Sequence, residues 1–318
     1  MKQHMHYDAA DLAAVMDAGD RLGIEREDQG IFLARQLDYV KSRIYEVQTP
    51  NLTGLQLVPV STEVPEWAES FTYRTYDEVG MAKFISNYAD DLPRVDVVGK
   101  EETLKLKSLG DAYGYSLDEM RLANAMGTNL PERKGRTARR AIDQLVNKVA
   151  LVGDDAHGFY GFTNHPNLGT TAVAGSWSAS ATTGQEILDD LLAMYDAVLV
   201  QSYDNHTPNT LAVAPTRRSA LVSKNVNTGG QWQSVWAAFQ SIHPGVSLIA
   251  STELEAAEGN GEAVMYERDV DNLSIEIPRP FEQLPAEKRN LEMVIDCIAK
   301  CSGVAIYRPL ALTKATGV

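Results

Sequence analysis

The sequence predicts an α+β protein, and three observations lead to that class. Alternating strand patterns occupy much of residues 55–116, a long helix with regular apolar spacing follows Pro131, and strands alternate with helices from residue 163 to residue 285. Elements of both kinds, each with one apolar face, are typical of mixed domains. At 318 residues, 44% of them apolar, the chain is long enough to bury a sizeable core.

The first fifty residues are expected to be helical. From Arg26 to Val47, apolar side chains recur at spacings of four and three, and Pro50 ends the pattern. An apolar stripe of this kind needs a partner surface, either in the same chain or on a neighbouring subunit. The stripe consists of Leu33, Leu37, Val40 and Ile44.

Two alternating segments, Ser70–Tyr76 and Thr103–Ser108, are predicted as strands. The residues between them include several charges, Gly80 and Pro93. The two strands form either an extended hairpin or parts of a compact sheet joined by a long loop. An extended hairpin is marginal alone and needs another surface to lie on.

The long helix after Pro131 carries the clearest charge imbalance in the chain. Its end is expected near Gly153, and its predicted apolar face comprises Ala138, Ala141, Ile142, Leu145 and Val149. Positive charges near a helix N-terminus oppose the helix dipole. The basic run is therefore either a solvated face that pairs with acidic neighbours or a face for sequence-independent contact with enclosed nucleic acid. Five basic residues form it: Arg133, Lys134, Arg136, Arg139 and Arg140.

The middle and the end of the chain supply the remaining elements. Helices are predicted over Thr183–Ser202, from Pro215 onward, and over Gly230–Ile242. The segment Asn290–Val318 is predicted as two strands broken at Ser302 and Gly303. Further strands are predicted over Thr210–Ala214, Val246–Ala250 and Ala263–Tyr266.

The sequence contains no motif that indicates catalysis or a cofactor. No phosphate-binding loop, zinc-protease helix, nucleophile elbow or zinc-type Cys/His spacing is present. Gly259 and Gly261 lack the third glycine of a dinucleotide fingerprint. His157 and His165 flank a glycine-containing loop, but their spacing matches no familiar metal-ligand pattern. We therefore expect no catalytic residues, no cofactor and no metal.

Charge, hydropathy and cysteine content exclude several classes of protein. The net charge of −14 argues against nucleic-acid binding over the whole surface. No apolar run approaches the roughly 18 residues that span a bilayer, and the N-terminus lacks the apolar segment of a signal peptide. Cys297 and Cys301 would lie roughly 13 Å apart in a strand, too far for a disulfide. We expect them to be buried, reduced thiols.

Nine segments of the chain, in this order and at this spacing, resemble the sequence pattern of a known protein family. They are Leu104–Glu119, Arg139–Leu145, Val152–Asp154, Gly158–Asn164, Leu211–Pro215, Met265–Asp269, Ile275–Pro278, Phe281–Leu284, and the end of the chain with Tyr307, Arg308, Pro309, Ala311 and Lys314. These segments resemble the major capsid proteins of tailed bacteriophages, especially their encapsulin-like branch. The resemblance covers most of residues 55–318.

The resemblance implies the shell fold shared by tailed-phage capsids and encapsulins, with an N-terminal arm, an extended loop, a peripheral domain containing a long spine helix, and an axial domain. It assigns residues 1–54 to the arm, 55–115 to the extended-loop hairpin and its flanking strands, 116–165 to the peripheral domain with its spine helix, 166–285 to the axial domain, and 286–318 to the return strands of the peripheral domain.

The resemblance also implies a function. The chain would be a structural major capsid protein, not an enzyme, that assembles as pentamers and hexamers into an icosahedral shell around double-stranded phage DNA. The five basic residues of the long helix would face the DNA and contact it non-specifically. The chain would be assembled in the host bacterial cytoplasm and would reside in the virion capsid, with a separate scaffolding protein and a portal as partners and no membrane. The alternatives are an encapsulin compartment that encloses a cargo enzyme and a cytoplasmic enzyme of an unrecognised α+β family.

Overall fold

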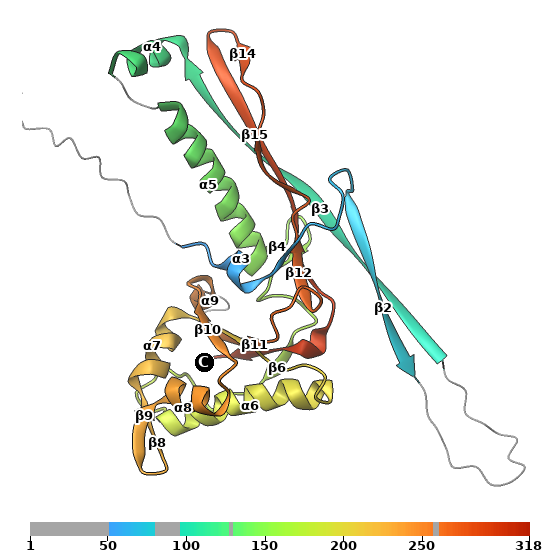
Figure 1. Ribbon diagram of the computed structural model, residues 1–318, viewed down its shortest axis with the longest axis vertical. Helices are drawn as coiled ribbons and strands as arrows, with labels where there is room; N and C mark the ends of the chain where they lie inside the picture. Colours follow the sequence, from blue (N-terminus) through green and yellow to red (C-terminus); the bar gives the residue numbers. More distant parts are fainter. Residues whose placement is uncertain (1–50, 80–95, 127–129, 257–260) are drawn as a thin grey trace, which may run out of the picture. The chain divides into compact units, whose positions relative to one another are not determined.

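A computed structural model describes residues 51–79, 96–126, 130–256 and 261–318 (Figure 1). The predicted helix over residues 26–47 lies outside these ranges, as does nearly all of the expected arm. Residues Asn51–Val318 form one compact unit. Helices and strands both contribute to it, so the α+β class is confirmed.

The strand β3 (Asp96–Ser116) organises the first sheet. Its first half pairs with β2 (Ser70–Val79) in antiparallel register, and its second half pairs with β15 (Glu292–Ser302). At about 3.3 Å per residue, the 21 residues of β3 extend over roughly 70 Å. Two further strands pair with β15: β13 (Arg279–Gln283) and β14 (Glu287–Arg289). The two predicted strands thus pair directly with each other, and we call this pair the β2–β3 hairpin. The residues 80–95 that join them lie outside the described ranges.

The helix α5 (Leu130–Leu151) follows α4 (Leu117–Met126) and packs against β3 and β15 (Figure 1). Its predicted apolar face is partly wrong, because Ala141 and Leu145 are exposed. Buried positions that recur at spacings of four and three form one stripe on a helix, and residues 141 and 145 lie to the side of it. The observed stripe is Ala138, Ile142, Val146 and Val149.

A second, five-stranded sheet has the strand order β10-β7-β11-β17-β6. Residues of one face, including Ala212, Val264 and Leu312, join the core that contains α5. Residues of the other face, including Leu211 and Met265, join a second core with α6 and α8. Burial on both faces explains why these strands are uniformly apolar in sequence. The strands are β6 (Gly169–Thr171), β7 (Thr210–Val213), β10 (Ser247–Ala250), β11 (Glu262–Tyr266) and β17 (Leu312–Thr316).

The helix α6 (Gly184–Ser202) begins where the sequence predicts, because Thr183 and Glu186 form a reciprocal capping box. The predicted helix Gly230–Ile242 is wrong in its first third. Positive φ angles at Gly229 and Gly230 turn the chain back into a hairpin, and the helix starts only after Ser234, which caps it. The elements concerned are β8 (Asn225–Thr228), β9 (Gln231–Ser234), α8 (Val235–Ile242) and, before them, α7 (Pro215–Ser223).

The C-terminal segment contains three strands where two were expected. The predicted break at Ser302 and Gly303 is confirmed, and it separates β15 from β16 (Val304–Ile306). A 3₁₀ turn over Pro309–Ala311 then precedes β17, because proline cannot donate a backbone hydrogen bond to a sheet. The strand β16 belongs to a small sheet with β1 (Val60–Ser61) and β12 (Leu273–Glu276). The short elements that remain are α3 (Gly54–Leu57), β4 (Gly153–Asp154), β5 (Phe159–Tyr160) and α9 (Glu253–Ala256).

Candidate nucleic-acid interface and assembly surfaces

The five basic residues predicted on the long helix all lie on α5, but they do not form one uniform face. On a helix of 3.6 residues per turn, Arg133, Arg136 and Arg140 project away from the buried stripe. Lys134 and Arg139 lie at its two sides. All of the arginines are exposed, whereas Lys134 is only partly exposed.

Lys134 is held by contacts within the chain. Its Nζ donates to the carbonyl oxygen of Gly114 at 2.7 Å and to Glu119 Oε2 at 3.1 Å, and it lies 4.8 Å from the centre of the Tyr115 ring. Its proximity keeps the pKa of the Glu119 carboxyl below its ordinary value. Lys134 therefore ties the start of α5 to the end of β3 and to α4.

Two of the arginines also have acidic neighbours on the same helix. Arg136 forms an ion pair with Glu132, four residues earlier. Arg139 lies 3.8 Å from Asp143, and its guanidinium lies 5.9 Å from the centre of the Phe281 ring. These pairs are exposed, so each contributes little to stability, and the arginines can exchange their partners for phosphate oxygens.

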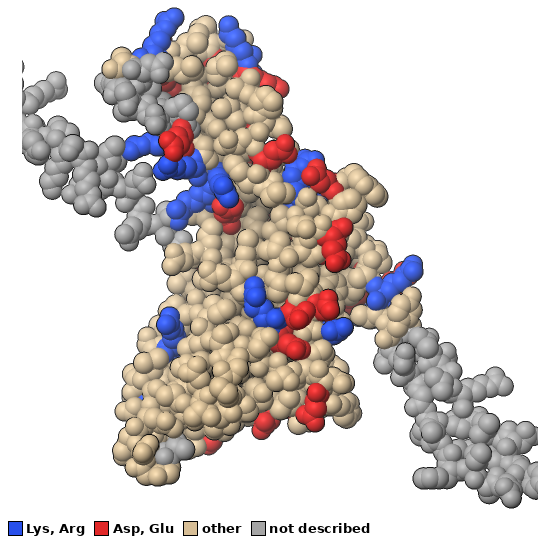
Figure 2. Space-filling view, in the orientation of Figure 1, with Lys and Arg blue, Asp and Glu red and all other residues tan. Residues whose placement is uncertain are grey.

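Arg133 contacts no acidic side chain within the part of the chain that the structure describes. Figure 2 shows Lys and Arg side chains gathered over α5, with only a few Asp and Glu side chains among them. This local excess of positive charge contrasts with the net charge of −14 for the whole chain. The face can hold an anionic polymer through sequence-independent contacts.

A second surface was not predicted from the sequence. A pocket of about 770 Å³ lies between the base of the β2–β3 hairpin, β12 and residues 307–310. The rings of Tyr73 and Tyr307 meet edge to face at 4.8 Å. The Tyr73 hydroxyl donates to the Glu102 carboxylate, and it lies 3.3 Å from the Ile306 carbonyl oxygen. Burial, together with the hydrogen bond to Glu102, raises the pKa of Tyr73. These contacts attach the hairpin to the body of the unit.

The residues considered for metal or thiol chemistry take structural positions. His157 Nδ1 lies 2.5 Å from Asp154 Oδ2 in an exposed turn, and His165 lies elsewhere, beside Tyr160. Among the described residues no three His, Cys, Asp or Glu side chains come together as metal ligands. Cys297 and Cys301 are buried free thiols, as predicted, and burial raises the pKa of Cys301 to about 11. In the same residues, no helix is both long and apolar enough to cross a bilayer.

A family model described as "Major capsid protein" matches residues 80–318. No match was found among curated proteins. The matched range covers three quarters of the chain. It contains α5, the whole of β3, the five-stranded sheet, and every strand of the first sheet except β2.

Solved structures share the fold at low sequence identity. The capsid of the myovirus phage XM1 is 18% identical, with a TM-score of 0.80 over 91% of this chain and 100% of that chain. The capsid of an empty GTA particle is 13% identical, with a TM-score of 0.65 over 89% and 96%. The SrpI encapsulin complex of Synechococcus elongatus is 14% identical, with a TM-score of 0.57 over 90% and 94%. The shell fold predicted from the sequence is confirmed.

Proposed function

Since the chain belongs to the major capsid protein family, we propose that many copies assemble as pentamers and hexamers into an icosahedral shell around double-stranded phage DNA. Family membership makes the chain a structural capsid protein. The particular assembly and its contents are the proposal. In a closed symmetric shell, many individually weak interfaces sum to a stable container.

The observation that carries the proposal is the two-stranded hairpin of β2 and β3. Residues 96–105 of β3 pair with β2, whereas β15 pairs only with residues 106–116. Within the described residues the hairpin therefore has no third strand along its length. A two-stranded ribbon is marginal alone, so a second copy of the chain is the natural surface for it.

The basic face of α5 supports DNA as the content. Phosphate contacts need positive charge without base-specific geometry, and Arg133, Arg136 and Arg140 offer that charge on an exposed surface. Lys134 and Arg139 extend the candidate face, although Lys134 is also engaged within the chain. The proposal also includes assembly in the host bacterial cytoplasm, with a separate scaffolding protein and a portal as partners. It further includes the division of the chain into an arm, an extended loop, a peripheral domain and an axial domain.

The encapsulin alternative rests on a specific observation, the fold match to the Synechococcus elongatus complex. That match has a lower TM-score than the match to the XM1 capsid, 0.57 against 0.80. The phage function is therefore the better supported of the two. The third possibility, an enzyme of an unrecognised family, has no comparable support, because the family model describes a capsid protein.

Negative-stain electron microscopy of the purified protein, with light scattering on the same sample, tests the proposal. We expect closed shells, rings of five or six copies, or tubes. A monodisperse monomer or dimer at every salt and protein concentration would contradict it. Particles that enclose a protein cargo and no DNA would favour the encapsulin function.

A further inference from the structure

The pocket beside the hairpin base is acidic. Three of its lining residues are carboxylates: Glu63, Asp271 and Glu276. Glu63 and Asp271 are exposed, whereas Glu276 is 3% exposed. No lysine, arginine or histidine of the described residues forms an ion pair with any of the three.

Glu276 is the unusual member of this group. Its Oε1 lies 3.5 Å from the Ser274 hydroxyl, and its Oε2 has no hydrogen-bond partner within the described part of the chain. A buried carboxylate oxygen without a partner is costly. The position of Glu276 is fixed by its strand, because β12 pairs with β1 on one side and β16 on the other.

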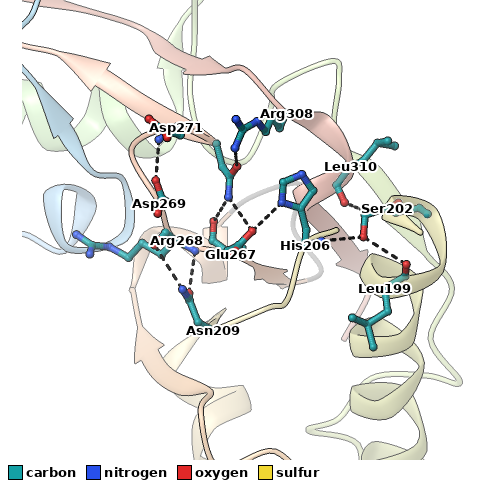
Figure 3. Close-up of polar contacts among 12 residues, drawn as sticks. Leu199, Ser202, His206, Asn209, Glu267, Arg268, Asp269, Asp271, Arg308 and Leu310 are labelled. Carbon is teal, nitrogen blue, oxygen red and sulfur yellow. Dashed lines mark hydrogen bonds and ion pairs between the residues drawn. The ribbon is translucent and has the colours of Figure 1, made fainter. Parts of the chain in front are cut away.

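The basic groups on the walls of the pocket are already engaged. Arg74 pairs with Glu101 at 2.6 Å. His206 lies 2.7 Å from Glu267 (Figure 3). Arg308 donates to the neutral side chain of Asn272 at 3.1 Å. The same Asn272 amide donates to Glu267, so these groups form one connected network (Figure 3). Arg308 therefore adds one positive charge to the walls, but none of the three carboxylates pairs with it or with another basic side chain of the described residues.

We propose that this pocket is an assembly contact that receives an arginine or lysine side chain from a second copy of the chain. The inference rests on the proposed function, because a shell places each copy against others. Charge complementarity favours this occupant: three carboxylates without a basic partner face a space that can hold an extended cationic side chain. The aromatic rings of Tyr73 and Tyr307 can pack against the aliphatic part of that side chain.

Carbodiimide labelling of carboxylates tests the occupant directly. Unassembled subunits and assembled shells, separated by size, are treated with glycine ethyl ester, and the labelling of Glu63 is followed by mass spectrometry. We expect Glu63 to be labelled in free subunits and at least about fivefold protected in shells, with no effect of a chelator. Asp196, an exposed carboxylate on α6 outside the pocket, serves as the internal reference.

Three outcomes would overturn the inference. Equal labelling of Glu63 in subunits and in shells would show that no copy fills the pocket. Protection already present in free subunits would assign the pocket to another part of the same chain. Protection that a chelator abolishes would assign it to a metal ion. In each case shells still form, so the proposed function would stand while this inference fails.

A variant pair gives an independent readout. Glu63→Gln should raise the protein concentration needed for assembly by about threefold, and Glu63→Gln with Glu276→Gln by about tenfold or more. The control Asp196→Asn removes the same charge elsewhere and, by lowering self-repulsion, should leave assembly unchanged or favour it. If the double variant fails to fold, Glu63→Gln alone still tests the proposal, because Glu63 is exposed and its replacement should not disturb folding. Equal assembly of Glu63→Gln and its control would contradict the proposal.

Discussion

Lys314 and Glu262 form an ion pair inside the five-stranded sheet. Lys314 Nζ lies 2.7 Å from Glu262 Oε1 and donates to the Thr163 carbonyl oxygen at 3.0 Å. The two residues occupy diagonal positions on β17 and β11, on one face of the sheet. Both are buried, with 8% and 1% of their surface exposed. Because removing a charge from water costs several kcal/mol, each charge depends on the other.

Replacing one residue of this ion pair should therefore strongly reduce the stability of the subunit. We expect Lys314→Met to lower the free energy of unfolding of the subunit by about 3–5 kcal/mol, because the buried Glu262 carboxylate loses its ion pair with Lys314. Denaturant unfolding followed by circular dichroism measures it. The matched control Lys288→Met, on exposed β14, should change stability by less than about 0.5 kcal/mol. A double replacement of Lys314 and Glu262 by Met should recover much of the loss; equal effects of the single variant and the control would contradict the ion-pair account.

His165 should make stability depend on pH. Burial lowers the pKa of its imidazole from 6.5 to about 4, and the residue is 7% exposed. Below about pH 6.5 the imidazole is protonated in the unfolded chain but remains neutral in the folded chain. The free energy of unfolding is therefore highest above that pH and decreases as the pH falls toward 4. Between pH 7 and pH 5 we expect a loss of about 1–2 kcal/mol.

Thermal or denaturant unfolding of His165→Gln at both pH values checks this prediction. The variant should lose that part of the pH dependence. His157→Gln, which alters an exposed histidine, should keep it. An unchanged pH profile in His165→Gln would show that the acid sensitivity has another source.

At the scale of elements, the turn that ends α5 depends on glycine. Gly153 and Gly158 both have positive φ angles, 78° and 72°. A Cβ atom at Gly153 would lie 2.4 Å from the Phe159 carbonyl oxygen, whereas a Cβ at Gly158 would meet no atom within 4 Å. The two glycines thus share a backbone conformation and differ in the space around them.

This difference gives a matched pair of variants. Gly158→Ala should cost about 1 kcal/mol, the price of a left-handed conformation alone. Gly153→Ala should cost at least about 3 kcal/mol, because the pairing of β4 with β5 must also open. Denaturant midpoints of the two subunits measure the difference. Equal costs would mean that the turn relaxes around the added methyl group.

Sequence patterns predicted elements where one local signal dominated. Strict alternation identified part of β2 and part of β3, and regular apolar spacing predicted α6 to within one residue of its observed bounds. The pattern failed where two signals competed: Trp232, Val235 and Phe239 have helical spacing, but Gly229 and Gly230 form a hairpin turn before it. The α5 stripe was misplaced because Ala141 and Leu145 each directly precede a buried residue, Ile142 and Val146, and both sets have helical spacing.

The basic face of α5 and the acidic pocket also differ in how far the sequence predicts them. The basic face of α5 is contiguous in sequence, so its charge could be predicted. The acidic pocket combines side chains from Glu63, Tyr73, Glu276 and Tyr307, which lie up to 244 positions apart in the chain. No local pattern marks them as pocket residues. Each is an ordinary strand or loop residue in the sequence, and only the small sheet of β1, β12 and β16, together with β2, brings them together.

At the scale of the whole molecule, the charge distribution separates a basic helix face from an acidic chain. Exclusion of DNA from most of the surface and attraction to one face would orient the subunit in a shell. Arg133, Arg136 and Arg140 are suited to this role, since their side chains are exposed and project away from the core. Lys134 is a poorer test position, because its removal also disturbs the contact between α5 and β3.

Replacing Arg133, Arg136 and Arg140 together with Gln should leave shells intact and reduce their retention of DNA. Each lost phosphate contact lowers the slope of log affinity against log salt concentration by about 1, so the variant shells should release DNA at lower salt than the unaltered ones. DNA content per particle across a salt series, with electron microscopy of the same particles, measures both effects. A control with Lys105, Lys107 and Lys288 changed to Gln removes three exposed positive charges elsewhere. Identical DNA retention by the two triple variants would show that net charge alone, and not the α5 face, holds the DNA.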